Sequence, residues 1–497
     1  MRGVRCVAVV LAVGAAVQPV RAQEAPKDGF HWMSEINKAS AVMVRETGIV
    51  PDDLGIAIAR SLARVIDDQS RPDAARPGDV IAIENLMRAY GGPDVSRLHS
   101  GRSRKDTGAT RERMILREAV LEAATAANRA RTSLLAFARQ DPHAIVPAYT
   151  EGVQAQPVSL GHYLTAYAEA LGRGVDRLRY VYGEVNRSPL GSGALGTSSF
   201  PVDRPRLADL LGFDGVTENS MDATLIADND TGAMAAGVAN TIAFTLGRFV
   251  TEISAQYRMT KPWMLLGEDL TTASSIMPQK RNPDIVNDTH LAASQVFAHY
   301  DAFIMSGHNF PNGLLPARDE ATAAVVQAAL ALDLLTELFE NLNFDAERAL
   351  AEVAAEYSTA TELADVLQRE ADVPFRVGHH FASLVVTHGR RGGFVPADFP
   401  YDAAQRLFTE AAQEFDLAAT ELPLSEERFR RSLDARAMVE ASRGLGGPQP
   451  AEVDRMMAAQ AAAIGEDEQW VAAAQGRLDA AALRRDDAFT AIVQAKE

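Results

Sequence analysis

Apolar residues recur along this chain at the spacing of an α-helix. One seam alternates steps of four and three residues, the pattern of a packed helix: Leu116, Val120, Ala123, Ala127, Ala130, Leu134 and Phe137. Four further stretches are alanine-rich, apolar and free of proline: 160–183, 230–260, 285–306 and 322–342. Helices of this length, with alanine on more than one face, are typical of a bundle whose backbones approach closely. The pattern therefore predicts an all-α fold built on a long central helix bundle.

Shifts in the same pattern divide the chain into segments. Strand signals are few, and residues 183–206 hold most of the glycine and proline between the long helices, which predicts a long loop. The charged, amphipathic tail is expected either to pack on the body of the protein or to bind a partner. Smaller helical domains are expected to flank the bundle, with these bounds: N-terminal domain 23–112, bundle domain 113–344, C-terminal domain 345–462 and helical tail 463–497.

The first residues form a separate pattern. Arg2 and Arg5 precede an apolar run over 7–17, and the segment ends in Val20-Arg21-Ala22. This arrangement is typical of a secretory signal peptide, and the run is too short to span a membrane. We therefore expect cleavage after Ala22 and a periplasmic or secreted protein; a buried N-terminal helix is the alternative. The remaining sequence predicts no membrane span in the mature chain.

Composition narrows the function classes. The chain has 497 residues and a formal net charge of -17 without a basic stripe, which argues against nucleic acid as a partner. Its one cysteine, Cys6, lies in the expected signal peptide, so no disulfide is expected. No metal-binding pattern and no glycine-rich phosphate loop is evident, so neither a metal nor a cofactor is expected. A small anionic substrate has to be attracted by local cations: Arg102, Arg104, Lys105 and Lys280.

One short loop carries most of the chemical information. Residues 273–283 read Ala-Ser-Ser-Ile-Met-Pro-Gln-Lys-Arg-Asn-Pro. Pro278 and Pro283 favour extended or turn geometry, so the polar groups between them are expected on a loop, where binding and catalytic groups concentrate. Hydroxyl groups, a cation and an amide in one loop suit a carboxylate or another small anion: Ser274, Ser275, Lys280 and Asn282.

This loop resembles the signature Gly-Ser-Ser-x-Met-Pro-x-Lys-x-Asn-Pro of the fumarase/aspartase superfamily, with Ala273 in place of the glycine. Two other stretches resemble argininosuccinate lyases. Residues 98–106 are similar to their His-x-Gly-Arg-Ser-Arg-Asn-Asp motif, and residues 149–157 to their Tyr-Thr-His-Leu-Gln-x-Ala-Gln-Pro motif. The segments 191–223 and 374–376 also read like that family. The resemblance covers roughly residues 75–440.

The resemblance implies an all-α, fumarase/aspartase-like fold. It also implies a homotetramer in which each site takes its motifs from three different subunits. The family reaction is an anti β-elimination, in which a proton leaves the carbon beside a carboxylate and a group leaves the next carbon, usually giving fumarate. The intermediate forms only if fixed cations and donors stabilise its doubly charged carboxylate.

Roles then follow residue by residue from the resemblance. Ser274 matches the serine taken as general base, which needs a neighbouring positive charge because a free serine is too weak an acid. Lys280 and Asn282 match the donors to the carboxylate of the intermediate, and Ser275 could add another. The other substrate contacts that we expect from the matched motifs are Ser103, Arg104, Thr150 and Gln156.

Several positions depart from argininosuccinate lyase. Glu151 stands where the family has a histidine, and Asn287 where it has the glutamate that pairs with that histidine. Glu151 serves either as a general acid, if burial raises its pKa, or as a structural hydrogen-bond partner of Asn287. Lys105 replaces an asparagine and adds a positive charge, which either favours a more anionic substrate or balances Glu151; Lys105 and Asn287 are both expected to line the substrate site. The Tyr, Gln and Lys that hold the guanidinium-bearing amino acid are lacking in 307–320, and Ile81 replaces a histidine.

These departures fall on the part of the site that selects the leaving group. The first hypothesis is therefore an exported lyase that cleaves a C–N bond, less favourably a C–O bond, in an N-substituted aspartate or related polycarboxylate to give fumarate. Argininosuccinate itself is not the expected substrate. The alternative hypothesis, motivated by Glu151 and Asn287, is a catalytically silent homologue that binds carboxylates or acts as a scaffold.

Overall fold

The structure, a computed structural model, describes residues 27–308, 316–418 and 421–496. The expected signal peptide and part of the 307–320 segment lie outside these residues. The chain divides into two units, one of Met1–Ser100 with Ala488–Glu497 and one of Gly101–Asp487.

The first unit is helical. Its elements are α1 (Gly29–Glu46), α2 (Asp52–Asp68), α3 (Val80–Gly91) and the 3-10 helix η1 (Pro93–His99). Asp28 caps α1 by accepting from the His31 N–H at 2.9 Å, and the same carboxylate accepts from Arg76 at 2.6 and 2.9 Å. Arg60 of α2 donates to the carbonyls of Val493 and Ala495 and so holds the C-terminal residues of the chain in this unit.

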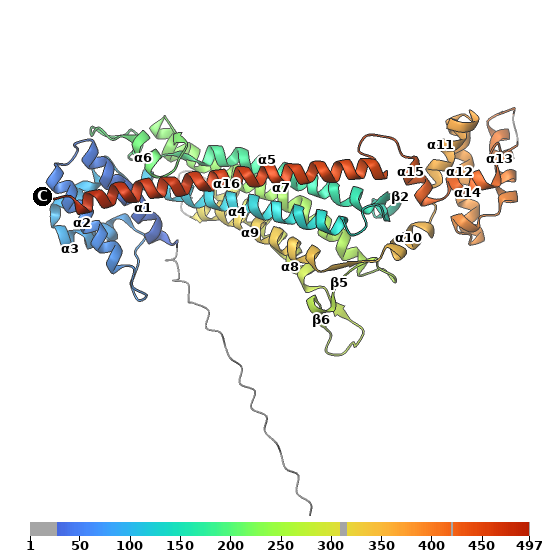
Figure 1. Ribbon diagram of the computed structural model, residues 1–497, viewed down its shortest axis with the longest axis horizontal. Coiled ribbons are helices and arrows are strands. Elements are labelled where there is room, and N and C mark those ends of the chain that lie inside the picture. Colours follow the sequence, from blue (N-terminus) through green and yellow to red (C-terminus); the bar gives the residue numbers. More distant parts are fainter. Residues whose placement is uncertain (1–26, 309–315, 419–420, 497) are drawn as a thin grey trace, which may run out of the picture. The chain divides into compact units, whose positions relative to one another are not determined.

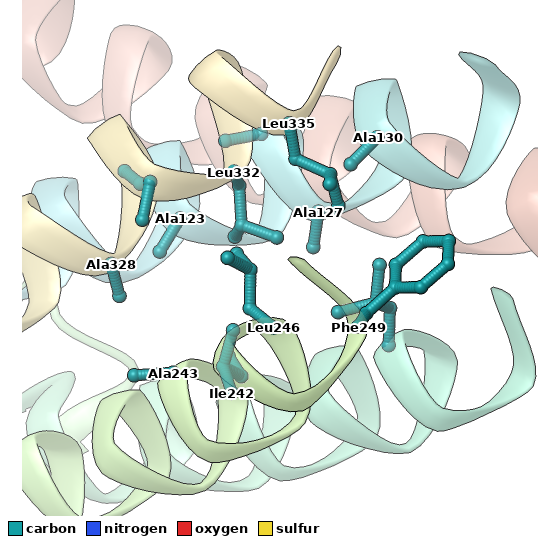
Figure 2. Packing of buried hydrophobic residues seen from close by; sticks show 14 of the residues in the cluster. Ala123, Ala127, Ala130, Ile242, Ala243, Leu246, Phe249, Ala328, Leu332 and Leu335 are labelled. Atoms are coloured by element: carbon teal, nitrogen blue, oxygen red, sulfur yellow. The ribbon is translucent and has the colours of Figure 1, made fainter. Parts of the chain in front are cut away.

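The second unit contains the long helices that the sequence predicts. These are α4 (Arg104–Ala138), α5 (Leu160–Val185), α7 (Ala227–Gln256), α8 (Asp284–Gly307) and α9 (Pro316–Glu340). Figure 2 shows their shared core, where leucine and phenylalanine side chains fill the space beside alanines: Ala123, Ala127, Leu246, Phe249, Leu332 and Leu335. Alanine on the facing surfaces lets the backbones approach, which is why the apolar positions are not confined to one stripe.

The C-terminal tail packs on this bundle as α16 (Pro450–Gln494), which begins earlier in the chain than the expected residue 463. In Figure 1 it lies along α4 and α5. Buried Ile464, Ala474 and Leu478 of α16 belong to the bundle core. Asp467 accepts from Arg131 of α4 and from Arg179 of α5, both at 2.6 Å. The tail is thus an integral helix of the bundle.

A second core lies among the C-terminal helices of the same unit. It is built from alanine, leucine and valine around four buried phenylalanines, Phe381, Phe399, Phe408 and Phe429. The helices are α10 (Ala346–Ala354), α11 (Ala360–Ala371), α12 (Phe375–Gly392), η4 (Pro396–Asp398), α13 (Tyr401–Glu414), α14 (Glu426–Ser432) and α15 (Ala435–Ala441).

Strands are short and form four two-stranded sheets in the described residues, so the all-α prediction is confirmed. The antiparallel pairs are β1 (Ile145–Thr150) with β2 (Val153–Ser159), β5 (Met264–Leu266) with β8 (Leu342–Phe344), and β6 (Thr272–Ala273) with β7 (Arg281–Asn282). The parallel pair is β3 (Arg187–Ser188) with β4 (Gly215–Val216). The remaining short helices are α6 (Arg204–Leu210), η2 (Asp222–Ile226) and η3 (Glu268–Leu270).

Two helical stretches, Asp222–Gln256 and Asp319–Glu340, are long and apolar enough to cross a membrane by length and composition. Both contribute side chains to the bundle core, and about half of each apolar window is buried there, 44% and 50%. Core helices of a bundle meet the same criterion, so the pattern is accounted for by packing.

Candidate functional site

The first group of expected site residues lies at the N-terminus of α4. Ser103 is the N-cap: its Oγ accepts from the Lys105 N–H at 3.2 Å, and Asp106 accepts from the Ser103 N–H at 2.9 Å. This capping box directs Arg104 and Lys105, both exposed, into the first turn. Two exposed cations at the positive end of a helix dipole make this end of the bundle suited to an anion.

Asp106 organises this end, although nothing in the sequence analysis assigned it a role. Its carboxylate is fully buried, at 0% exposure. One oxygen accepts from the N–H groups of Ser103 and Thr107, and the other accepts from Gly191 and Gly193 at 3.0 Å each. Burial raises the pKa of Asp106, while these donors and Arg102 oppose that rise. The carboxylate therefore ties α4 to a glycine-rich loop far along the chain.

The second group lies on the β1–β2 hairpin. Its two-residue turn consists of Glu151 and Gly152, whose φ angles of 54° and 75° are both left-handed, as a type I′ turn requires. Thr150 and Glu151 are exposed at this tip. Gln156, lower on β2, donates to the Thr361 hydroxyl at 3.3 Å.

Tyr149 lies beside the irregularity in this hairpin, where the register shifts after Ala148. Burial raises the pKa of Tyr149 to about 12, so its phenol stays neutral near neutral pH. Gln154 is held by a hydrogen bond from its amide to the Glu352 carbonyl at 3.1 Å. The hairpin is thus anchored on α10 and α11, and only its tip is free to meet other groups.

The third group lies on the loop between β6 and β7, as the prolines predict. The Ser274 hydroxyl accepts from the N–H groups of Met277 at 3.1 Å and Ile276 at 3.4 Å. The Ser274 N–H donates to the Lys280 carbonyl at 3.4 Å, which closes the loop. Ser274 and Asn282 are half-buried, whereas Ser275 and Lys280 are exposed. The loop therefore carries hydroxyl, amide and cationic side chains in one short segment, and backbone N–H groups point at the oxygen of Ser274.

Asn287 follows this loop in the first turn of α8, where it is exposed. In the part of the chain that the structure describes, no hydrogen bond joins Asn287 to Glu151. The structural pairing considered for these two residues is therefore not formed within one described chain, and Glu151 remains available at its turn.

The three groups do not meet in one chain. With 35 residues, α4 is about 52 Å long at about 1.5 Å per residue, and Ser103 lies at its start. The hairpin follows its other end. The segment that leads into the loop between β6 and β7 begins near that end too, because Phe344 of β8 contacts both Phe137 of α4 and Trp263 next to β5, with ring centroids 6.3 and 6.2 Å apart. Ser103–Lys105 and the Ser274 loop therefore lie at opposite ends of the bundle.

The described side chains of these three groups do not form a metal site. Among the described residues, no cluster of three or more histidine, cysteine, aspartate or glutamate side chains is placed to hold a metal ion. The polar groups of the three regions are hydroxyls, amides and cations, which are donors suited to carboxylate oxygens.

Comparison with known proteins places the sequence among lyases. A family model described as Lyase matches residues 65–298, and one described as argininosuccinate lyase C-terminal matches residues 357–440. The argininosuccinate lyase of Methanoculleus marisnigri is 31% identical over 473 residues, covering 92% of this chain and 93% of its own length. That of Natronomonas pharaonis is 35% identical over 400 residues, covering 79% of each chain.

Solved structures agree. The crystal structure of EDDS lyase in complex with formate has a TM-score of 0.86 at 28% identity, covering 94% of this chain and 92% of that chain. An EDDS lyase variant with bound fumarate has a TM-score of 0.85 with the same identity and coverage. Class II fumarase from Schistosoma mansoni, at 17% identity and a TM-score of 0.63, shares the fold. The chain therefore belongs to the fumarase/aspartase superfamily, close to argininosuccinate lyase, and is a carbon–nitrogen lyase.

Proposed function

We propose that this protein is an exported lyase that cleaves the C–N bond of an N-substituted aspartate or related polycarboxylate by anti β-elimination, giving fumarate and an amine. The observation that carries the proposal is the Ser274 hydroxyl, which accepts hydrogen bonds from two backbone N–H groups. Lys280 and Asn282 lie in the same loop.

Ser274 acts as the general base. Two N–H donors aimed at Oγ stabilise a negative charge on that oxygen, because hydrogen bonds to the charged form favour it. Lys280 supplies a positive charge in the same loop. The alkoxide takes the proton from the carbon beside the substrate carboxylate, and Ser274 then carries that proton as a neutral hydroxyl.

The carboxylate beside that carbon is held by fixed donors. Lys280, Asn282 and Ser275 approach it from the loop, and Ser103, Arg104, Thr150 and Gln156 complete the clamp. These donors stabilise the doubly charged intermediate more than the substrate, which is the condition for lowering the barrier. Collapse of the intermediate expels the amine and leaves the double bond of fumarate.

A site of this kind requires several chains. Because the end of α4 with Ser103 and the loop with Ser274 lie at opposite ends of the bundle, neighbouring subunits have to supply the missing groups. Large apolar side chains on the bundle helices are exposed in the single chain, such as Phe244 at 58%, Leu291 at 57% and Val326 at 52%. These features support a homotetramer whose sites each use three subunits.

The leaving-group side of the site differs from argininosuccinate lyase. Glu151, exposed on its turn, reaches the site of a neighbouring subunit and acts as the general acid toward the departing amine. Lys105, exposed in the first turn of α4, adds a cation. An anionic amine is thus favoured over a guanidinium-bearing one. The structural likeness to EDDS lyase, which is named for a substrate other than argininosuccinate, supports a different leaving group.

Export is part of the proposal and rests on residues 1–22 alone. Expression with and without this segment, followed by fractionation and mass determination of the product, tests it. A protein that stays in the cytoplasm at full length contradicts it.

Turnover is tested on the purified protein. Argininosuccinate, other N-substituted aspartates, and fumarate with a panel of amines are supplied, and the absorbance of the double bond is followed. We expect turnover of an N-substituted aspartate and its loss in Ser274→Ala, whereas Ser70→Ala, an exposed serine of the N-terminal unit, is unchanged. Full activity of Ser274→Ala contradicts the base assignment.

The same experiment addresses the alternative function. If fumarate raises the melting temperature while no substrate is turned over, the protein is a carboxylate-binding homologue without catalysis, as the changes at Glu151 and Asn287 first suggested.

A further inference from the structure

The C-terminal helices enclose a charged hollow that the proposed reaction does not use. It has a volume of about 760 Å³ and lies between α11, α14 and the end of α15, which are labelled close together in Figure 1. This volume is within the usual range for small-molecule sites. Its charged lining consists of four arginines and three glutamates, in a chain whose net charge is -17.

Three ion pairs among four side chains form the closed part of the lining, the weakest of them between Arg369 and Glu370 at 3.6 Å. Arg428 donates from Nε and Nη2 to the two oxygens of Glu370, at 2.7 and 2.6 Å. Arg369 donates to Glu362 at 2.9 Å, and Glu362 is only 7% exposed. The pKa of Glu370 is lowered, chiefly by the hydrogen bond from Arg428, so this pair stays ionised near neutral pH. These four side chains neutralise one another and shape the wall.

Three charges of the lining remain open. Arg431, Arg443 and Glu440 line the hollow, and within the described residues none of them has an ion pair or a side-chain hydrogen bond. All three are exposed to solvent. The open set is therefore two guanidinium groups and one carboxylate, which is the charge complement of a molecule with two carboxylates and one ammonium group.

We propose that this hollow binds an aminodicarboxylate of the aspartate type. Arg431 and Arg443 take the two carboxylates, for which the planar guanidinium is the best matched side chain, and Glu440 takes the ammonium group. Because the global charge of the chain repels anions, these local arginines have to supply the attraction. The closed pairs keep Arg369 and Arg428 from competing for the same carboxylates, so recognition falls on the open groups.

Binding is measured by calorimetry with L-aspartate as the titrant, on the full chain carrying Ser274→Ala and Lys280→Gln, which remove the hydroxyl and the cation of the catalytic loop. We expect aspartate to bind and the double variant Arg431→Gln/Arg443→Gln to weaken binding about tenfold or more. The matched control is Arg406→Gln, an exposed arginine of α13 outside the hollow, which should leave the affinity unchanged.

Glu440→Gln separates the two parts of the recognition. It should weaken the binding of aspartate several-fold without weakening that of succinate, which lacks the ammonium group. Unchanged aspartate affinity in the double variant overturns the proposal, as does equal binding of succinate and aspartate by the parent protein. Because the readout is binding and not turnover, either result is independent of whether the proposed elimination takes place.

Discussion

Replacing Asp106 by asparagine tests whether a buried carboxylate holds the N-terminal end of α4 in place. The change preserves size and removes the charge. Asparagine can present its oxygen to only one pair of donors. Its NH2 group then faces the other pair, either Ser103 and Thr107 or Gly191 and Gly193, so two hydrogen bonds become donor–donor contacts.

The magnitude follows from these contacts. Two hydrogen bonds to a charged acceptor contribute about 3–6 kcal/mol together. Burial is the larger influence on the pKa of Asp106 and raises it, so removing the charge also relieves a desolvation cost. We therefore expect a net loss of about 2–4 kcal/mol in the free energy of unfolding.

Urea denaturation measures this loss, and the matched control is Glu122→Gln. That residue lies on the same helix with its side chain 60% exposed, so the same change of charge should cost less than about 0.5 kcal/mol. We also expect a lower kcat/KM, because Ser103 and Arg104 shift when the loop at Gly191 is released. A loss in stability equal to that of the control refutes the reasoning that the four N–H donors hold this end of the bundle.

Three further perturbations test other parts of the structure. Asp467→Ala leaves Arg131 of α4, whose side chain is only 2% exposed, without its carboxylate partner. The free energy of unfolding, measured by chemical denaturation, should fall by about 3–5 kcal/mol. Asp479→Ala, on the exposed side of α16, should change it little. The pKa of Asp28 is lowered, chiefly by its hydrogen bond with Arg76, so the ionised carboxylate stabilises the fold above its ordinary pKa of 3.8 and this stabilisation is lost as pH falls through the folded value. Below about pH 4, the melting temperature of the parent should therefore fall more steeply with pH than that of Asp28→Asn. Glu151→Gly suits the left-handed turn better and should raise stability by about 0.5–1 kcal/mol while lowering kcat; unchanged turnover excludes Glu151 from proton transfer.

The sequence by itself determined the helices and the chemical groups. The alternation at Leu116–Phe137 and the proline-free apolar stretches depend on neighbours three and four residues away, so a local pattern is sufficient to predict them. The same holds for the loop at 273–283, whose prolines exclude a helix and whose polar groups suit an anion. The departure at Glu151 was also visible in the sequence, although its left-handed turn became evident only in the folded hairpin.

Only the tertiary structure decided which distant groups meet. Nothing in the sequence marked Asp106, whose carboxylate accepts from Gly191 and Gly193 in a loop far along the chain. The docking of α16 through Asp467 and the open charges of the C-terminal hollow arise in the same way. These contacts depend on how whole helices pack, a property of the chain's global arrangement that local periodicity and turn chemistry do not contain.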